Sequence, residues 1–235
     1  MRYWSRRWTL SDSNPTARSP IVNRVLLLVN LVVWLYTFSL AGDPGALDAF
    51  YRAYAFDWGT FTGALRAGDV RPEVIYPLIA HMFLHGGWLH VIGNMLYLWI
   101  FGDNVEDRLG SLRYLAFYLL CGIAAATGQG LIAPAPMVGA SGAVAGVLGA
   151  YLFLFPGSRV RTLIFLGIFI TIVQLPAIVV IGLWIVVQLL SGLAELRMSG
   201  ASTPANIAFF AHVVGFIAGI LLLAVIRPSR RVRVR

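Results

Sequence analysis

The chain has 235 residues, of which 59% are hydrophobic and only 12% are charged. A soluble domain carries about 25% charged residues, so this composition argues against a soluble domain and indicates a polytopic membrane protein. All 18 basic residues are arginines, which give a net charge of +8, and the lack of lysine excludes a Ser–Lys catalytic pair. The single cysteine, Cys121, provides no disulfide framework.

Six apolar segments are long enough to cross a bilayer as helices. In chain order they cover approximately residues 22–41, 88–103, 113–133, 137–156, 176–194 and 206–226. A further apolar segment, 162–175, is short and stops before Pro176, so we expect an interfacial or re-entrant piece rather than a seventh span. The sequence therefore predicts an all-α, polytopic, six-transmembrane-helix bundle.

The arginines predict the orientation of this bundle. With six spans both termini lie on one side of the membrane, and only four arginines lie on the other side: Arg52, Arg66, Arg71 and Arg197. The positive-inside rule then places a basic N-terminal segment (1–21) and a basic tail (227–235) in the cytoplasm, on either side of a transmembrane domain (22–226). We expect no nucleic-acid partner, because the arginines follow topology. High arginine content without lysine favours a GC-rich bacterial genome, so we expect a bacterial plasma-membrane protein.

Two features of the first third of the chain leave alternatives open. Residues 39–41 resemble a signal-peptidase site, but the preceding apolar segment is longer than the usual 7–15 residues, so a retained span is preferred. The loop from 43 to 77 is long and rich in aromatic residues, which favour the membrane interface. It is either a packed cap or a route for substrate access.

The most unusual residues of the spans are a serine and a histidine. Ser141 lies in Met-Val-Gly-Ala-Ser-Gly-Ala-Val-Ala-Gly (137–146), and His212 lies in Phe-Ala-His-Val-Val-Gly-Phe-Ile-Ala-Gly (210–219). An ionisable group inside a membrane is by default a candidate functional residue. Both helices enter from the extracytoplasmic side, which places the two side chains at depths of about 6 and 9 Å. We expect them to meet just below that surface.

This pair predicts acyl-transfer chemistry. A serine hydroxyl needs a base to become a nucleophile, and His212 suits that role. The developing oxyanion needs donors, which the Asn94 amide, the Ser141 N–H and His90 supply. His90 and Asn94 share one face of the span 88–103 because they are four residues apart. No acid is well placed in the spans, so we expect a Ser–His dyad.

Small residues allow the two helices that carry the dyad to approach closely. On the first helix the residues recur every four positions: Ser141, Ala145 and Gly149, with Gly142 and Gly146 alongside. On the second they share one face at i, i+3 and i+7: His212, Gly215 and Gly219. Ordinary helix packing is the alternative explanation for these glycines. With a serine and a histidine at the head of the two faces, we favour an arrangement that supports chemistry.

The remaining histidines raise the possibility of a metal site. His81 and His85 have helical i, i+4 spacing, and His90 follows them. However, there is no His-Glu-x-x-His motif and no carboxylate in this cluster to serve as a base. We therefore expect no metal and no cofactor, and we expect His81 and His85 to order the loop by hydrogen bonds or to hold water near the site.

These residues resemble the rhomboid intramembrane serine proteases. The matching elements are His81-x3-His85-x4-His90-x3-Asn94, Val105-Glu-Asp-Arg-Leu-Gly110, Gly139-Ala-Ser141-Gly142 and Ala211-His212-x2-Gly215-x3-Gly219, in the family's order. The resemblance implies a six-helix bundle with Ser141 as nucleophile and His212 as general base. It implies oxyanion-side or substrate-binding roles for His90, Asn94 and Gly139, and supporting roles for His81, His85, Gly142, Gly215 and Gly219.

Two positions depart from the family pattern. Tyr76-Pro77 stands where many members have Trp-Arg, and Ala145 stands where some have a tyrosine that stacks on the histidine. We expect another group to hold the His212 ring, with backbone packing against the small face as the candidate.

The resemblance implies that the partners are the lipid bilayer and single- or multi-pass membrane proteins, cleaved in or beside their transmembrane helices. The loop 196–205 is a candidate cap that opens with span 176–194. Two other functional classes remain possible, a catalytically silent relative and a transporter. A catalytically silent relative binds membrane proteins but lacks the serine or the histidine. A transporter needs polar residues along a whole path, whereas here they stop at one layer.

Overall fold

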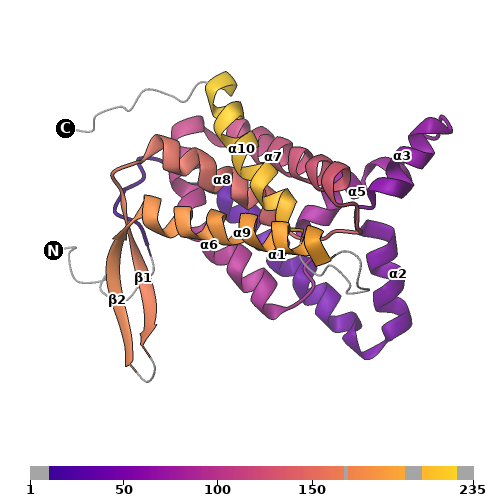
Figure 1. Ribbon diagram of the computed structural model, residues 1–235, viewed down its shortest axis with the longest axis horizontal. Helices are drawn as coiled ribbons and strands as arrows, with labels where there is room; N and C mark the ends of the chain where they lie inside the picture. The colour runs from indigo at the N-terminus through magenta and orange to yellow at the C-terminus, as the bar shows by residue number, and fades with distance from the viewer. Residues whose placement is uncertain (1–10, 167–168, 199–207, 227–235) are drawn as a thin grey trace.

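The computed structural model describes residues 11–166, 169–198 and 208–226. Figure 1 shows that long helices dominate it: α1 (Ile21–Ser39), α6 (Trp88–Leu109), α7 (Ser111–Ile132), α8 (Ser141–Leu154), α9 (Ala177–Met198) and α10 (Phe209–Ile226). These helices correspond one to one to the six predicted spans. The prediction of a polytopic helical membrane protein is confirmed.

The helices differ in how well they match a bilayer. Among the described residues, four are long and apolar enough to cross it: Ile21–Gly42, Ser111–Ile132, Ala177–Ala194 and Phe209–Ile226. Helix α6 has 22 residues but carries charged side chains in its last two turns. Helix α8 is apolar but has only 14 residues, so it is about 21 Å long.

The short helix α8 is the centre of the bundle. It packs against α10, α7 and α6, and every residue from Gly142 to Tyr151 is buried. Figure 1 shows α8 among the other long helices. Because its neighbours enclose it, α8 does not need to match the thickness of the membrane.

The start of α8 differs from the sequence prediction, which placed the helix from residue 137. Met137 instead forms an isolated antiparallel bridge with Phe56, with N···O distances of 2.9 and 3.1 Å. Gly139 has a φ of +127°, which is outside the helical region and favours glycine. Ser141 is therefore the first residue of the helix rather than one turn inside it.

The acidic turn of α6 fixes the start of α1. Glu106 is buried and accepts hydrogen bonds from the backbone N–H groups of Val22 and Asn23 at 3.1 and 2.7 Å. A carboxylate at this position satisfies orphan donors and interacts favourably with the helix dipole. Gly110 follows with a φ of +81° and turns the chain directly into α7.

The segment between α1 and α6 folds as short helices at one end of the bundle: η1 (Leu40–Gly42), α2 (Pro44–Tyr54), α3 (Trp58–Arg66), α4 (Pro72–Ile75), α5 (Pro77–Ala80) and η2 (His81–Phe83). Asp43 and Asp57 cap α2 and α3 through their carboxylates. The aromatic residues predicted to favour the interface pack together here, with Phe56 almost completely buried.

The segment 162–175 is a β-hairpin, which the sequence analysis did not predict. Strands β1 (Arg159–Leu166) and β2 (Phe169–Pro176) pair antiparallel, and Figure 1 shows the hairpin projecting from the end of the bundle opposite α2 and α3. As expected, this segment does not form a seventh transmembrane helix. Its β-branched and aromatic residues favour a strand. Residues 11–13 pair with β1 through two backbone hydrogen bonds and one bond from the Arg159 N–H to the Ser13 hydroxyl.

Candidate active site

Ser141 and His212 lie next to each other in the folded chain. The Ser141 hydroxyl and His212 Nε2 are 2.7 Å apart, which is a hydrogen bond between the start of α8 and the first turn of α10. His212 is buried, with 7% of its surface exposed, whereas Ser141 is half-buried. The structure thus brings together two residues that are 71 positions apart in sequence.

The small faces of α8 and α10 make this contact possible. A Cβ atom added to Gly215 would overlap the carbonyl oxygen of Gly142, and one added to Gly219 would overlap that of Gly146. Larger side chains at these positions would therefore push the helices apart. The expected close approach of the two helices is present, and it brings Gly142, Gly215 and Gly219 into direct contact across the pair.

Gly139 shapes the segment just before Ser141. Its N–H donates a 2.9 Å hydrogen bond to the carbonyl of His81, which anchors this segment to η2. A Cβ atom at Gly139 would lie 2.6 Å from His90 Nε2 and 3.5 Å from the Ser141 hydroxyl. The His90 imidazole and the serine hydroxyl therefore flank the same small space, which a side chain at residue 139 would fill.

His90 lines this space from α6, and Asn94 shares its face of the helix four residues later. The Gly86 N–H makes a long contact of 3.5 Å to His90 Nδ1, so Nδ1 is the acceptor and the imidazole proton is on Nε2. Nε2 is the ring nitrogen that lies next to Gly139. Asn94 lies one turn further along α6 and is buried, and its amide nitrogen has no hydrogen-bond partner among the described residues. Both side chains thus retain unused N–H groups.

His81 and His85 lie in the loop before α6 and differ in their bonding. His81 Nδ1 donates to the Pro77 carbonyl at 2.9 Å, the loop-ordering bond that was expected. Neither ring nitrogen of His85 has a partner in the part of the chain that the structure describes, and its ring lies edge-on to that of His90. Burial lowers the pKa of His81 to about 4 and that of His85 to about 3.

The group that holds the His212 ring was not predicted. His212 Nδ1 lies 2.6 Å from the side-chain oxygen of Gln188 on α9, and the Trp184 ring lies 5.6 Å from the imidazole. This corrects the expectation that backbone packing against the small face around Ala145 would orient the ring. Because an amide oxygen only accepts, Nδ1 carries the proton and the Nε2 lone pair faces Ser141.

A second missed residue fixes the start of α10. Gln129 on α7 accepts a 3.1 Å hydrogen bond from the N–H of Ala211, the residue before His212. Its amide group also donates to the Ala133 carbonyl at 2.7 Å. Both glutamines are polar residues inside apolar segments, and that signal alone could have identified them as candidates.

The described residues bear on the metal alternative and on the candidate cap. Within residues 11–166, 169–198 and 208–226, no three His, Cys, Asp or Glu side chains are grouped as they would be around a metal ion. The candidate cap at 196–205 lies for the most part outside the described residues.

Residues 72–229 match the model of the rhomboid domain. The chain belongs to the rhomboid family. The matched region covers α4 to α10 and includes every residue that the sequence analysis placed at the site. Helices α1 to α3 precede it.

Several rhomboids are similar over parts of the chain. The rhomboid protease GluP of Bacillus subtilis is 40% identical over 82 residues, which are 35% of this chain and 16% of GluP. Rhomboid protein 1, a mitochondrial protein of Saccharomyces cerevisiae, is 33% identical over 95 residues, or 37% of this chain and 28% of that protein. The rhomboid protease GlpG of Yersinia pestis is 32% identical over 75 residues, or 32% of this chain and 27% of GlpG. The matches thus cover less than a third of each of these relatives.

Proposed function

We propose that this rhomboid is an intramembrane serine endopeptidase that cleaves transmembrane segments of other membrane proteins. The observation that carries the proposal is the 2.7 Å hydrogen bond between the Ser141 hydroxyl and His212 Nε2. The proton of Nδ1 is committed to Gln188, so Nε2 is free to accept the serine proton. The protease names of GluP and GlpG point to the same chemistry.

The first half of the reaction forms an acyl-enzyme. The Ser141 oxygen attacks the scissile carbonyl carbon while its proton moves to His212 Nε2. Collapse of the tetrahedral intermediate breaks the C–N bond, and the imidazolium gives its proton to the leaving amine. In the second half, water attacks the acyl group, His212 again takes and returns a proton, and the serine hydroxyl is restored.

The charge on the intermediate requires preorganised donors. The unpartnered amide nitrogen of Asn94 and the Nε2–H of His90 are suited to this role because both lie on one face of α6, where His90 flanks the space that Gly139 leaves open. The N–H of Ser141 belongs to the first turn of α8, whose donors have no intrahelical partner. These three groups make up the proposed oxyanion site.

The substrate must present an accessible peptide bond at this level of the membrane. A regular helix shields its carbonyls, so we expect substrates with helix-weakening residues near the membrane surface and a small residue at the cleavage point. We infer from the arginine distribution that both termini are cytoplasmic and that the site opens near the extracytoplasmic face of a bacterial plasma membrane. The inferred partners are single- or multi-pass membrane proteins.

A reconstituted cleavage assay tests the proposal. The purified chain in liposomes should cleave a transmembrane peptide with a helix-weakened segment, and Ser141→Ala or His212→Ala should lower the rate at least about 1000-fold, because nucleophile and base act as a unit. The matched control is Ser39→Ala, since Ser39 is exposed and caps only a backbone carbonyl at the end of α1. This control should keep the wild-type rate.

A second readout separates chemistry from substrate choice. A fluorophosphonate should label the wild-type chain at Ser141 and should not label Ser141→Ala. Cleavage that survives Ser141→Ala would contradict the mechanism, and loss of activity with a chelator would favour the metal alternative. A wild-type chain that neither cleaves nor reacts with the probe would be a catalytically silent rhomboid.

A further inference from the structure

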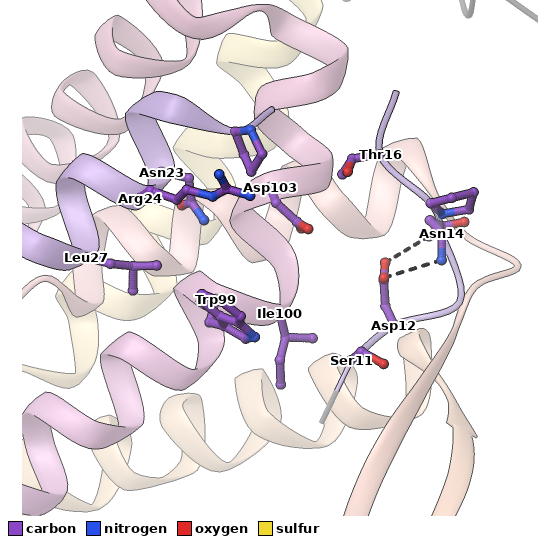
Figure 2. Close-up of a pocket in the computed structure, with 12 residues that line it drawn as sticks. Ser11, Asp12, Asn14, Thr16, Asn23, Arg24, Leu27, Trp99, Ile100 and Asp103 are labelled. Atoms are coloured by element: carbon purple, nitrogen blue, oxygen red, sulfur yellow. Dashed lines mark hydrogen bonds between the residues drawn. The ribbon is translucent and has the colours of Figure 1, made fainter. Parts of the chain in front are cut away.

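Two cavities of different character adjoin between α1 and α6. One is polar, has a volume of about 270 Å³, and is lined by residues of α1, α6 and the segment 11–16 (Figure 2). The other is an apolar groove of about 480 Å³ on the same pair of helices. Leu27 and Trp99 line both cavities, so the polar space continues directly into the groove.

The polar cavity contains both signs of charge. Figure 2 shows Arg24 of α1 and Asp103 of α6 pointing into the space between the two helices. Arg24 is exposed, and its guanidinium forms no ion pair or hydrogen bond with any residue that the structure describes. One oxygen of Asp103 accepts from Asn104, and the other accepts no hydrogen bond within the described ranges. A cationic and an anionic group are thus both available to a ligand.

The outer wall of this cavity is held in place by Asp12. Its carboxylate accepts hydrogen bonds from the Tyr151 hydroxyl at 2.5 Å and from the Asn104 amide at 3.0 Å. Asn14 donates to the same carboxylate at 3.1 Å, as the dashed lines of Figure 2 indicate. Because its own carboxylate is satisfied, Asp12 shapes the cavity, while Arg24 and Asp103 remain for recognition.

The groove has the length and chemistry of a site for an acyl chain. Every residue that lines it is apolar, among them Leu28, Leu31, Trp34, Val91 and Met95. From Trp99 to Trp88 it follows eleven residues of α6, or about 16 Å at 1.5 Å per residue. That length is close to half of the hydrocarbon thickness of about 30 Å, which is the depth that one lipid chain covers.

We propose that the α1–α6 gap binds one phospholipid with an ethanolamine headgroup, from the leaflet at the arginine-rich end of the bundle. Arg24 binds the phosphate, Asp103 accepts from the primary ammonium, and one acyl chain fills the groove beyond Trp99. A cavity of about 270 Å³ holds the volume of roughly nine waters, which suits a phosphoethanolamine group of about eight non-hydrogen atoms. Ionised partners of both signs make these hydrogen bonds strong.

This assignment predicts a specific selectivity. A choline headgroup has no N–H to donate to Asp103, and a glycerol headgroup offers only neutral hydroxyls while adding net negative charge. The site therefore prefers the ethanolamine lipid over both, although all three carry the phosphate that Arg24 binds. An ordinary annular lipid would show no such preference.

Native mass spectrometry of the full chain measures this selectivity. The protein is exchanged into detergent with equal amounts of phosphatidylethanolamine, phosphatidylcholine and phosphatidylglycerol that have identical acyl chains. We expect one retained phosphatidylethanolamine, favoured at least about fivefold over the other two lipids. Equal retention of the three lipids, or no retained lipid, overturns the proposal.

Variants separate the two halves of the headgroup site. Asp103→Leu, which removes both acceptor oxygens, should abolish the preference for ethanolamine over choline, and Arg24→Gln should lower retention of all three lipids. The matched control is Arg66→Gln, because Arg66 is an exposed arginine of α3 at the other end of the molecule. A control variant that loses lipid to the same extent as Arg24→Gln contradicts the site.

A measurement on the unmodified chain avoids the risk that a variant does not fold. Phosphatidylethanolamine with a photoreactive group on its acyl chain should crosslink to peptides of α1 and α6, and excess unlabelled phosphatidylethanolamine should suppress the crosslink more than phosphatidylcholine does. Crosslinks spread evenly over α9 and α10, or equal suppression by the two lipids, would show annular lipid only and would overturn the assignment. None of these readouts requires proteolytic activity.

Discussion

Gln188 offers the sharpest test of the proposed catalytic geometry. Its side-chain oxygen lies 2.6 Å from His212 Nδ1, on the side of the ring opposite Ser141. Replacing it with leucine keeps a side chain of similar size on α9 but removes the hydrogen-bond acceptor. The His212 ring then has no partner for its Nδ1 proton, so both its tautomer and its orientation are less well defined.

The size of the effect follows from the charge that His212 acquires. The bond joins two neutral groups in the resting enzyme, whereas the ring is an imidazolium in the transition state. A hydrogen bond to a charged group contributes about 1.5–3 kcal/mol. Losing this contribution mainly in the transition state lowers kcat by roughly 10- to 150-fold and leaves KM almost unchanged. Gln188→Glu retains an acceptor and should lose less activity than Gln188→Leu.

Steady-state cleavage in liposomes gives kcat and KM for each variant, and the rate of fluorophosphonate labelling reports on Ser141 without a protein substrate. Val187→Leu is the matched control, because the neighbouring side chain is exposed on the outer surface of α9. A Gln188→Leu enzyme with wild-type kcat would refute the reasoning. A change in KM alone would assign Gln188 to substrate binding instead.

Three further predictions test other parts of the site. Gly139→Ala should lower the cleavage rate at least about tenfold, because a φ of +127° costs a non-glycine residue about 1–3 kcal/mol and the new Cβ meets an imidazole at 2.6 Å. Gly215→Ala should separate α8 from α10, lower the unfolding temperature and abolish fluorophosphonate labelling, whereas Gly182→Ala, with open space around it, should change neither. His81 and His85 stay neutral in the folded chain because burial lowers their pKa values to about 4 and about 3, while the unfolded chain takes up protons near pH 6.5. Stability is therefore lost as the pH falls below about 6.5, by about 1 kcal/mol per histidine between pH 6.5 and 5.5, and thermal unfolding in detergent at the two pH values measures it.

The sequence was sufficient to predict the six long helices and the meeting of Ser141 with His212. Apolar length indicates a span, and polar residues at similar depth in neighbouring spans indicate a shared site. Two boundaries were wrong: α6 continues to Leu109 rather than ending near 103, and α8 begins at Ser141 and not at residue 137. Hydropathy cannot detect the start of α8, because the extended conformation of Met137 depends on its pairing with Phe56, which is distant in sequence.

Gln188 was not predicted because a glutamine is not ionisable, and a residue that orients a catalytic histidine is expected to be an acid. Its role depends on how α9 is rotated about its axis and on where α9 lies relative to α10. Hydrophobic periodicity predicts neither the rotation nor the position of α9, because this helix has no distinct polar face. Trp184, one turn earlier on α9, shows the same limit: its contact with His212 exists only in the assembled bundle.

The hairpin was missed for a different reason. Its strands are apolar enough to resemble a short membrane segment, and single-sequence patterns do not distinguish a short apolar strand from a piece of helix. The β-branched residues were the available signal. The docking of residues 11–13 along β1 could not be predicted, because a short polar segment carries no pattern that identifies its partner.

The loop between α1 and α6 makes contacts with residues that are distant in sequence, and these contacts support the position of Ser141. Phe56 is 1% exposed and pairs with Met137, and the Tyr51 hydroxyl donates to the His85 carbonyl at 2.7 Å. The loop is therefore a packed element that holds the extended segment in front of Ser141 and the loop before α6. Phe56 lies before the region that matches the rhomboid domain model, which begins at residue 72. A residue outside the matched region thus supports the position of Ser141 inside it, and a substitution that weakens the Phe56–Met137 pairing should act on the position of Ser141 even though it removes no group from the site.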